Sequence, residues 1–332
     1  EKLTAKTVIV TPKKETVLDF GQNLSGWVSF KVKGKKGDTI TIYHAEVLDK
    51  NGNFYTDNLR AAKAQTTYVL KGDGEEVFEP HFTWQGFRYI KVVGYPGDLV
   101  KENFTANVLH SDMQSIGTFT SSNTLINQLQ HNIEWGQKGN FLDVPTDCPQ
   151  RDERLGWTGD AQVFSRTAAF NKNVHPFFAK WLKDLEADQI EGRVPHVIPN
   201  VLGKGNVNSA GWSDVATIIP WNMYLAYGDT KILADQYNSM KAYVESVRAV
   251  ANNNLWNNGS HYGDWLFFRP EDDNDGRSAV TDKNYIAQIF YANSIQLLVN
   301  AAKVLNNQTD VQLYTNLLQA VKAAFLQEYV TP

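Results

Sequence analysis

Hydrophobic and polar residues alternate along the first third of the chain, in short segments rich in β-branched and aromatic residues. Clusters of turn residues such as Gly34–Asp38 and Lys50–Asn53 separate these segments, a pattern typical of strands joined by tight turns. The predicted strands are Val8–Val10, Thr16–Phe20, Trp27–Val32, Thr39–His44, Thr66–Leu70, Arg88–Val93 and Phe104–Leu109. Strands this short, at near-regular spacing, predict an antiparallel β-sandwich of jelly-roll type.

From Ser121 onward the apolar residues recur with the 3.6-residue period of helices. Residues 121–123 can cap a first helix. Its apolar face would carry Leu125, Ile126, Leu129 and Ile133. Further helices are predicted over residues 158–170, 175–190, 212–227, 231–250, 283–305 and 310–329. The change of period predicts a β-sandwich domain over residues 1–112 and a helical domain over residues 113–332.

Three long loops interrupt the predicted helices, over residues 139–157, 191–211 and 252–280. Loops this long in a compact helical domain tend to be functional. The first is the richest, because Pro145–Asp160 places four carboxylates, two arginines and a tryptophan in sixteen residues. A site that grips a polyhydroxylated ring and moves protons on it needs these groups together.

Composition narrows the function classes. A net charge of −4 and a pI near 6.0 do not indicate binding to nucleic acid or to an anionic membrane. The chain has no apolar run of the ~18 residues that a membrane span needs. Cys148 is the only cysteine, which excludes an internal disulfide and disfavours a thiolate zinc site. We therefore expect no metal and no cofactor, and the sequence does not indicate an oligomeric state.

The absence of disulfides fits the cytoplasm, but a secreted or periplasmic location stays open. The chain opens at Glu1, which is no natural initiator, so we expect a processed form or an excised piece whose trimmed N-terminus would hide an export signal. Cys148 can be a catalytic thiol or a small residue packed under the loop. No histidine lies near it in sequence and a proline follows it, so we favour the packed residue.

The segment Asp147–Asp160 closely resembles glycoside hydrolase family 78, the α-L-rhamnosidases. The resemblance continues through Asn23–Trp27, Thr83–Tyr89, Gly211–Asp214 and Gly263–Leu266, and so covers nearly the whole chain. It implies a β-sandwich followed by an (α/α)6 barrel. It also implies hydrolysis of terminal α-L-rhamnosides with inversion, and therefore L-rhamnose-containing glycosides as substrates.

The resemblance implies a role for individual residues as well. Glu153 would be the general acid, and an acid of this kind needs a raised pKa in a shielded site. The residues that would bind the rhamnose are Asp147, Arg151, Trp157, Asp160, Trp212, Asp264 and Trp265. Charged acceptors such as Asp147 and Asp160 suit sugar hydroxyls.

An inverting enzyme also needs a carboxylate base on the opposite face of the sugar, about 6.5–9.5 Å from the acid. In the family this base is a glutamate far downstream of the acid, and we can assign no residue of this chain to that role. Seven long helices are predicted, fewer than the six helix pairs of a closed (α/α)6 barrel. We therefore expect the chain to be the N-terminal part of a catalytic unit that hydrolyses poorly, or not at all, by itself.

Each of these residues has a structural alternative. Asp160 can simply favour the start of a helix, and Glu153 can be an ordinary ion-pair partner of Arg151 or Arg154. The three site tryptophans can be core residues, and His196, a lone loop histidine, is more often structural. Trp27 and Trp84 can form a lectin-like face, but their alternation with Val28, Phe30, Phe82 and Phe87 favours a sandwich core or a domain seam.

The acidic run Glu271–Gly276, with Asp282, nearly matches the spacing of a calcium-binding loop. Its first and last ligands are wrong and Ser278 stands where an apolar residue belongs, so a rim loop is favoured. Two other functions stay open for the whole chain. One is another inverting or phosphorolytic enzyme on a helical barrel, and the other is a carbohydrate-binding relative without catalysis.

Overall fold

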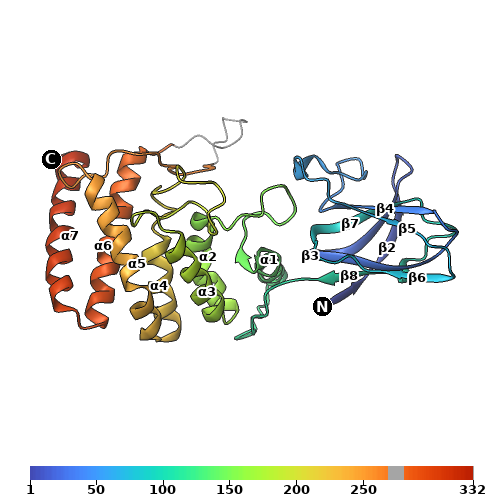
Figure 1. Cartoon of the computed structure of the whole chain (residues 1–332), viewed down its shortest axis with the longest axis horizontal. Coiled ribbons are helices and arrows are strands. Elements are labelled where there is room, and N and C mark those ends of the chain that lie inside the picture. The colour runs from blue at the N-terminus through green and yellow to red at the C-terminus, as the bar shows by residue number, and fades with distance from the viewer. Residues whose placement is uncertain (268–279, 332) are drawn as a thin grey trace. The chain divides into compact units, whose positions relative to one another are not determined.

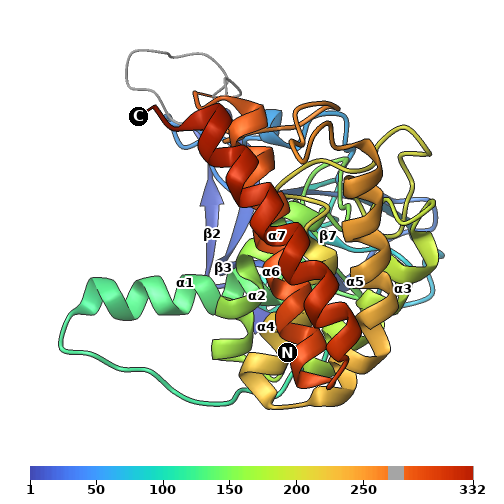
Figure 2. The same ribbon diagram turned by 90° about the vertical axis from the view of Figure 1, so that its left-hand side faces the viewer.

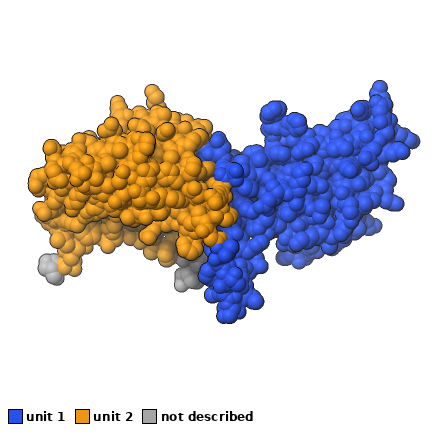
Figure 3. Space-filling view, turned by 90° about the horizontal axis from the view of Figure 1, so that it is seen from below, with its two compact units in different colours: residues 1–112, 118–155 blue, residues 113–117, 156–332 orange. Residues whose placement is uncertain are grey.

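The computed structural model describes residues 1–267 and 280–331, which form two compact units (Figure 3). Unit 1 comprises residues 1–112 and 118–155, and unit 2 comprises residues 113–117 and 156–332. The predicted boundary at residue 112 lies between the last strand of the sheet and the first helix. That it separates two domains stays a prediction. No helix among the described residues is long and apolar enough to cross a membrane. The calcium-like run Glu271–Gly276 and Ser278 lie outside the described residues.

Unit 1 is built on an eight-stranded sheet in which every pairing is antiparallel. Its strands are β1 (Lys2–Thr4), β2 (Thr7–Val10), β3 (Thr16–Lys33), β4 (Thr39–Ala45), β5 (Gln65–Val69), β6 (Glu75–Phe78), β7 (Gln85–Val93) and β8 (Phe104–Val108) (Figure 1). The order is β1-β8-β3-β7-β4-β5, and β2 and β6 also pair with β3. The short, polar β1 and β6 were not predicted, because neither has an apolar run.

The predicted strands Thr16–Phe20 and Trp27–Val32 are one strand, β3, so their separation was wrong. The register against β7 shifts between Asp19 and Leu24, which accommodates the residues between the two predicted segments. Beyond it, Val28 and Phe30 enter the core whereas Trp27 faces the other side and donates from Nε1 to Glu79 Oε1 at 2.8 Å. Phe82, which we expected in the core, is fully exposed, at a left-handed φ of +59°.

The first helix, α1 (Thr124–Asn140), begins where predicted, and the Asn123 side chain accepts hydrogen bonds from two backbone amides of its first turn. Its N-terminal apolar residues, Leu125 and Leu129, are exposed. The C-terminal half joins the sheet, since Trp135 packs against the sheet core and Ser25 Oγ donates to the Gly139 carbonyl at 2.8 Å. Two strands of two residues each, β9 (Phe141–Leu142) and β10 (Val144–Pro145), then pair as a hairpin that leads into the loop beginning at residue 146.

Unit 2 contains six helices among its described residues: α2 (Thr158–Asn171), α3 (His175–Asp188), α4 (Val215–Tyr227), α5 (Thr230–Val250), α6 (Lys283–Val304) and α7 (Gln308–Tyr329). Helix α4 packs against its neighbours α2, α3, α5 and α6, and α6 and α7 run side by side (Figure 2). All lie close to their predicted positions. Helix α4 starts at Val215 rather than Trp212, because residues 209–214 form turns held by the Asp214 carboxylate.

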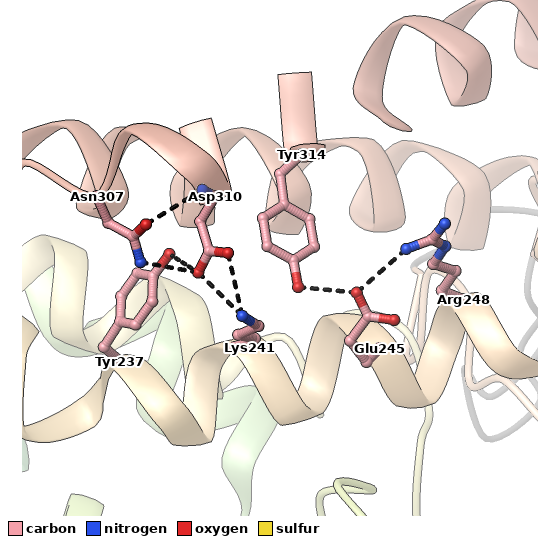
Figure 4. Close-up of polar contacts among 7 residues, drawn as sticks. All are labelled: Tyr237, Lys241, Glu245, Arg248, Asn307, Asp310 and Tyr314. Carbon is pink, nitrogen blue, oxygen red and sulfur yellow. Dashed lines mark hydrogen bonds and ion pairs between the residues drawn. The ribbon is translucent and has the colours of Figure 1, made fainter. Parts of the chain in front are cut away.

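A polar network joins α5 to α7 (Figure 4). The Asp310 carboxylate, on the first turn of α7, accepts from the Tyr237 hydroxyl at 2.8 Å and from the Lys241 ammonium at 3.0 Å. One helical turn further along α5, Glu245 accepts from the Tyr314 hydroxyl at 2.8 Å. Every carboxylate here has a donor from the opposite helix, so the network fixes how α5 and α7 meet.

Candidate active site

The acid loop, which we define as residues 146–155, is a closed turn in unit 1 without helix or strand. Two hydrogen bonds join its ends, from Asp147 N to the Leu155 carbonyl at 3.1 Å and from Leu155 N to Asp147 Oδ1 at 3.3 Å. Arg154 takes a left-handed φ of +53° to complete the turn. Of the loop predicted over residues 139–157, residues 146–157 are without helix or strand as expected, whereas residues 139–140 end α1 and residues 141–145 contain β9 and β10.

The strand β7 and the residue before it support the acid loop. The Arg154 guanidinium lies over the Trp84 ring, 4.1 Å from its centroid, and its Nη2 donates to Gln85 Oε1 at 3.3 Å. At Gly86 a Cβ would lie 2.7 Å from that of Gln150, so only glycine lets the loop come this close. Trp84 therefore contributes to neither a lectin-like face nor the sheet core, since its ring packs beneath the acid loop.

Glu153 is held by two arginines. Its Oε2 accepts from Arg60 Nη1 at 2.8 Å, and from Arg151 Nε at 2.9 Å and Nη2 at 2.8 Å. The Glu153 side chain keeps only 18% of its exposure, against 55% for Arg60. The ion pair between Glu153 and Arg151, the structural alternative for this residue, is thus formed. It does not explain why a second acid lies next to the Glu153 carboxylate.

That second acid is Asp147, and the ligand atoms of Asp147, Cys148 and Glu153 all lie within 4.8 Å of one another. Burial raises the pKa of Asp147, and the nearby Glu153 charge raises it further against the hydrogen bonds from Cys148. Burial also acts to raise the pKa of Glu153, but Arg151 and Arg60 outweigh it and hold that pKa below its ordinary value. The expectation of a raised pKa at Glu153 is therefore wrong for the free chain, in which Asp147 is instead the acid whose pKa lies above its ordinary value.

Cys148 is neither a nucleophile nor a convincing metal ligand here. Burial, together with its hydrogen bond to Asp147 and that carboxylate's charge, raises the pKa of the thiol to about 12, so it stays protonated at neutral pH. A cation would have to compete with Arg60 and Arg151 for Glu153. Asp147 and Glu153 are thus two neighbouring carboxylates paired with arginines. Cys148 beside them fits the interpretation of a small packed residue.

Unit 2 contributes an aromatic cluster, which we define as Trp157, Trp212, Tyr262 and Trp265 with His196. The Tyr262 ring is at its centre, with centroids 4.4 Å from Trp212, 5.6 Å from Trp265 and 6.3 Å from Trp157. Trp265 remains 43% exposed. The three predicted tryptophans thus come together around a tyrosine and are not fully buried core residues, so their rings can offer apolar walls to a sugar.

Tyr262 was not predicted, and His196 was set aside as structural. The Tyr262 hydroxyl and His196 Nδ1 lie 3.0 Å apart, and burial lowers the pKa of His196 to about 4, so a neutral imidazole shares this hydrogen bond. The His196 carbonyl accepts from both the amide and the hydroxyl of Thr158, at 3.0 Å each, which ties the cluster to the start of α2. The density of aromatic residues between His261 and Trp265 was the available signal.

The turn that carries Trp212 is braced from beneath. Asp214, fully buried, accepts from Gly211 N at 2.8 Å and from Ser294 Oγ of α6 at 2.6 Å. The Trp212 ring lies so close to the first turn of α2 that a Cβ at Gly159 would meet it at 2.7 Å. Gly159, in the Trp-Thr-Gly-Asp part of the sequence, is therefore needed to seat this ring.

The two remaining predicted residues differ in surroundings. Asp160 is exposed in the first turn of α2, where the helix dipole favours a carboxylate in any case. Asp264 accepts from the backbone amides of Val280 and Thr281 at 2.9 and 3.2 Å, and these bonds lower its pKa against the opposing effect of burial. Asp264 therefore braces the loop that carries Trp265.

Known proteins match the chain over its whole length. Residues 114–332 match the family described as the bacterial alpha-L-rhamnosidase 6 hairpin glycosidase domain, and residues 9–110 match the bacterial alpha-L-rhamnosidase concanavalin-like domain. An alpha-L-rhamnosidase of Formosa agariphila is 40% identical over 97% of this chain and 35% of its own length. One of Streptomyces avermitilis is 41% identical over 99% of this chain and 31% of its own length.

Solved structures agree in fold. The Streptomyces avermitilis alpha-L-rhamnosidase complexed with L-rhamnose has a TM-score of 0.92 at 40% identity, covering 100% of this chain and 31% of that one. The Aspergillus terreus alpha-L-rhamnosidase has a TM-score of 0.93 at 38% identity, over 100% of this chain and 39% of that one. The chain thus spans about a third of the length of these relatives.

The predicted fold, a β-sandwich followed by part of a helical barrel, is confirmed by these matches and by the strands and helices of the two units. The acid loop and the aromatic cluster both lie within the matched residues. With the glycosidase domain alone matching residues 114–332 of 332, the chain belongs to the bacterial α-L-rhamnosidase family.

Proposed function

We propose that this chain is the N-terminal part of an exo-acting, inverting α-L-rhamnosidase in which Glu153 is the general acid. The observation that carries the proposal is the carboxylate pair of Asp147 and Glu153, held with Arg151 on one closed loop. Support comes from relatives named α-L-rhamnosidases, one of them solved in complex with L-rhamnose. The substrates are accordingly glycosides with a terminal L-rhamnose.

The sugar is held by groups of two kinds. Asp147, Arg151 and Asp160 hydrogen-bond its hydroxyls, since charged partners make the stronger bonds to neutral hydroxyls. Trp157, Trp212 and Trp265 cover the apolar parts of the ring. Asp264 acts through the Trp265 loop, because its oxygens already accept backbone hydrogen bonds. Binding the sugar excludes water and draws Arg151 toward a hydroxyl.

Proton supply is the requirement that the free chain does not yet meet. Glu153 must be protonated to assist departure of the leaving group, but two arginines favour its charged form. Asp147, with a raised pKa, keeps its proton longer and lies next to Glu153. When Arg151 engages the substrate, the attraction that keeps Glu153 ionised weakens and burial raises its pKa. The pair thus shares one proton, and the substrate decides which member holds it.

We can assign the catalytic base to none of the described residues, and we propose that it belongs to a C-terminal extension. Support comes from the coverage, since the relatives are about three times as long, and from the seven helices of the described residues against the six hairpins named for the family. The 332-residue chain would then bind rhamnose but hydrolyse its glycosides poorly, or not at all.

A non-catalytic carbohydrate-binding role is the second candidate. The lowered pKa of Glu153 favours it, because a permanently charged glutamate serves binding better than proton donation. A third possibility, another sugar on a related inverting barrel, differs in the product released.

The deciding experiment measures release of L-rhamnose from an aryl α-L-rhamnopyranoside by this chain, by its Glu153→Gln variant and by a C-terminally extended form. Turnover that requires both Glu153 and the extension supports the proposal in full. Turnover by the unextended chain would mean that a residue within 1–332 is the base. Rhamnose binding without turnover in any form supports the binding role instead.

A further inference from the structure

Unit 1 contains a cavity of about 270 Å³ beside the acid loop. Its walls come from the β3 bulge (Gln22–Ser25), from Glu46 after β4, from the C-terminal half of α1 and from residues 147–150 of the acid loop. Of the described residues that line it, only Asp147 also belongs to the proposed rhamnose-binding set. The cavity is therefore adjacent to that site without being the same site.

The wall chemistry suits a neutral, hydroxylated ligand. Side-chain amides dominate it, from Gln22, Asn23, Asn132, Asn140 and Gln150. An amide both donates and accepts, which matches a sugar hydroxyl. No lysine or arginine stands among the described lining residues, whereas the carboxyl groups of Glu46 and Asp147 do. An anionic ligand would meet these two acids, while the nearby Arg151, which is not part of the lining, is already paired with Asp147 at 3.8 Å and with Glu153 at 2.8 Å.

The amide wall is already ordered by hydrogen bonds. Asn23 Nδ2 donates to Glu46 Oε1 at 2.8 Å, and the Gln22 Oε1 and His131 Nε2 atoms lie 2.8 Å apart. These bonds fix the amides before any ligand arrives, which reduces the entropy lost on binding. Burial raises the pKa of Glu46, against the opposing hydrogen bond from Asn23 and the charge of Arg151.

One polar atom of the wall has no partner. Asn140 Nδ2 donates to the Gly136 carbonyl at 2.7 Å, but the buried Asn140 Oδ1 accepts no hydrogen bond within the described residues. A buried amide oxygen left without a donor costs about 1–3 kcal/mol, so such an atom is normally satisfied by water or by a ligand. Asn140 Oδ1 has almost no accessible surface, so a ligand hydroxyl in this cavity would supply the missing donor only after a small shift of the Asn140 side chain.

The position of the cavity relative to Glu153 indicates which sugar it takes. Asp147 lines the cavity and presents a ligand atom within 4.8 Å of that of Glu153. The general acid donates its proton to the oxygen that links rhamnose to the rest of the substrate. The residue on the far side of that oxygen must therefore lie close to Glu153, and the cavity is linked to Glu153 through Asp147, which lines it.

We propose that this cavity is a leaving-group subsite that binds the neutral sugar residue to which the terminal rhamnose is linked. The inference rests on the proposed function and adds a substrate class to it, namely rhamnosides of neutral sugars in preference to rhamnosides of uronic acids or of small aryl groups. Discrimination comes from the amides of α1 and of the acid loop, and the two carboxyl groups exclude a uronate.

The test is equilibrium binding to the 332-residue chain by isothermal titration calorimetry. The probes are L-rhamnose, α-L-rhamnopyranosyl-(1→2)-D-glucose, its (1→6) isomer and α-L-rhamnopyranosyl-(1→4)-D-glucuronate. The variant Asn132→Ala/Gln150→Ala removes two amides and keeps the Gln150 Cβ that packs on Gly86. Asn132→Trp, at an exposed helical position, fills the rim instead. Gln312→Ala, an exposed amide on α7, is the matched control.

We expect at least one neutral disaccharide to bind about tenfold more tightly than rhamnose, a gain equal to one or two good hydrogen bonds. Both cavity variants should abolish that gain and leave rhamnose affinity unchanged, while Gln312→Ala changes nothing. Equal affinities for rhamnose and both neutral disaccharides, unaffected by the variants, would overturn the subsite and leave the proposed function standing. Tighter binding of the glucuronate would overturn the neutral class. Failure of every probe to bind would count against both proposals.

Discussion

Two carboxylate clusters in this chain look alike in composition and differ in arrangement. In the α5–α7 network the two carboxylates, Asp310 and Glu245, lie on different helices, and each accepts from donors on the opposite helix. In the acid loop two carboxylates, Asp147 and Glu153, share a turn with Arg151. The first cluster has donors enough for its charge, whereas the second crowds two like charges together.

The physical consequence is that the two carboxyl groups of the second cluster have pKa values shifted in opposite directions. Burial raises the pKa of Asp147, with the charge of Glu153 adding to it, while Arg151 and Arg60 lower the pKa of Glu153. Pairs of acids whose environments separate their pKa values are typical of acid–base sites. The comparison therefore assigns a structural role to the α5–α7 network and a chemical role to the acid loop, and each assignment can be tested.

The largest expected effect is at Glu153. In the C-terminally extended form, Glu153→Gln keeps the shape of the side chain but cannot donate a carboxylic proton, so kcat/KM for an aryl rhamnoside should fall by about 10³-fold. Asp152→Asn, the exposed neighbour on the same loop, is the control and should retain activity. An equal loss of kcat/KM in both variants would mean that activity depends on the total charge of the loop. Glu153 would then not be assigned as the general acid.

Asp310→Ala tests the other side of the comparison. The change leaves Lys241 and the Tyr237 hydroxyl without their acceptor, and we expect the free energy of unfolding to fall by about 2 kcal/mol. Lys241 is 40% exposed, so water compensates part of the loss. The control Asp235→Ala breaks an exposed pair with Lys231 and should cost at most about 0.5 kcal/mol in the same urea titrations. A large change in rhamnose affinity at Asp310→Ala would contradict a purely structural role.

A third variant sharpens the comparison with an uncharged cluster. Tyr262→Phe keeps the ring between Trp212 and Trp265 and removes only the hydroxyl that meets His196. If this hydrogen bond positions the aromatic walls, rhamnose should bind about fivefold more weakly to the 332-residue chain, a loss typical of one hydrogen bond. Tyr224→Phe, whose ring packs against Trp221 instead, is the control. Unchanged affinity would leave Tyr262 as a packing residue.

How far the sequence predicts these features depends on the range of the interactions. Helices α2 to α7 followed from local periodicity, and the cap at Asn123 from a local hydrogen bond. Which face of the sheet a side chain occupies was less predictable. Trp27 and Phe82 have apolar neighbours in the sequence, yet both side chains lie outside the core. Their placement depends on sheet pairing with distant strands, which no local pattern contains.

The site shows the same limit. Asp147, Arg151 and Glu153 could be predicted to lie together because one short loop holds them all, and their roles stay a prediction. Tyr262 was missed, because its neighbours Trp157 and Trp212 come from loops about 105 and 50 residues earlier in the chain. The direction of the Glu153 pKa shift was also missed: Arg151 of the same loop lowers this pKa most, and Arg60, a residue of the β half that reaches the acid loop through tertiary structure, lowers it further.

Arg60 gives the smallest and most specific test of the comparison. Burial raises the pKa of Glu153, while Arg151 and then Arg60 lower it, so Arg60→Gln should raise that pKa. A general acid is active while protonated, so the alkaline limb of kcat/KM against pH should move to higher pH in the extended form. Since the lowered pKa of Glu153 stabilises the fold above its unfolded pKa and loses this effect as pH falls, Arg60→Gln should also lower stability slightly at neutral pH and not in acid.

Arg193→Gln, which removes an exposed arginine paired with Glu191 in unit 2, makes the same change in net charge and should leave the limb in place. Both pH profiles would be measured at constant ionic strength, because Arg60 is itself 55% exposed and its effect is screened by salt. A limb that stays fixed in Arg60→Gln would mean that another group titrates there. The raised pKa of Asp147 makes that carboxyl the first alternative, and the acid loop would then work with the two carboxylates in exchanged roles.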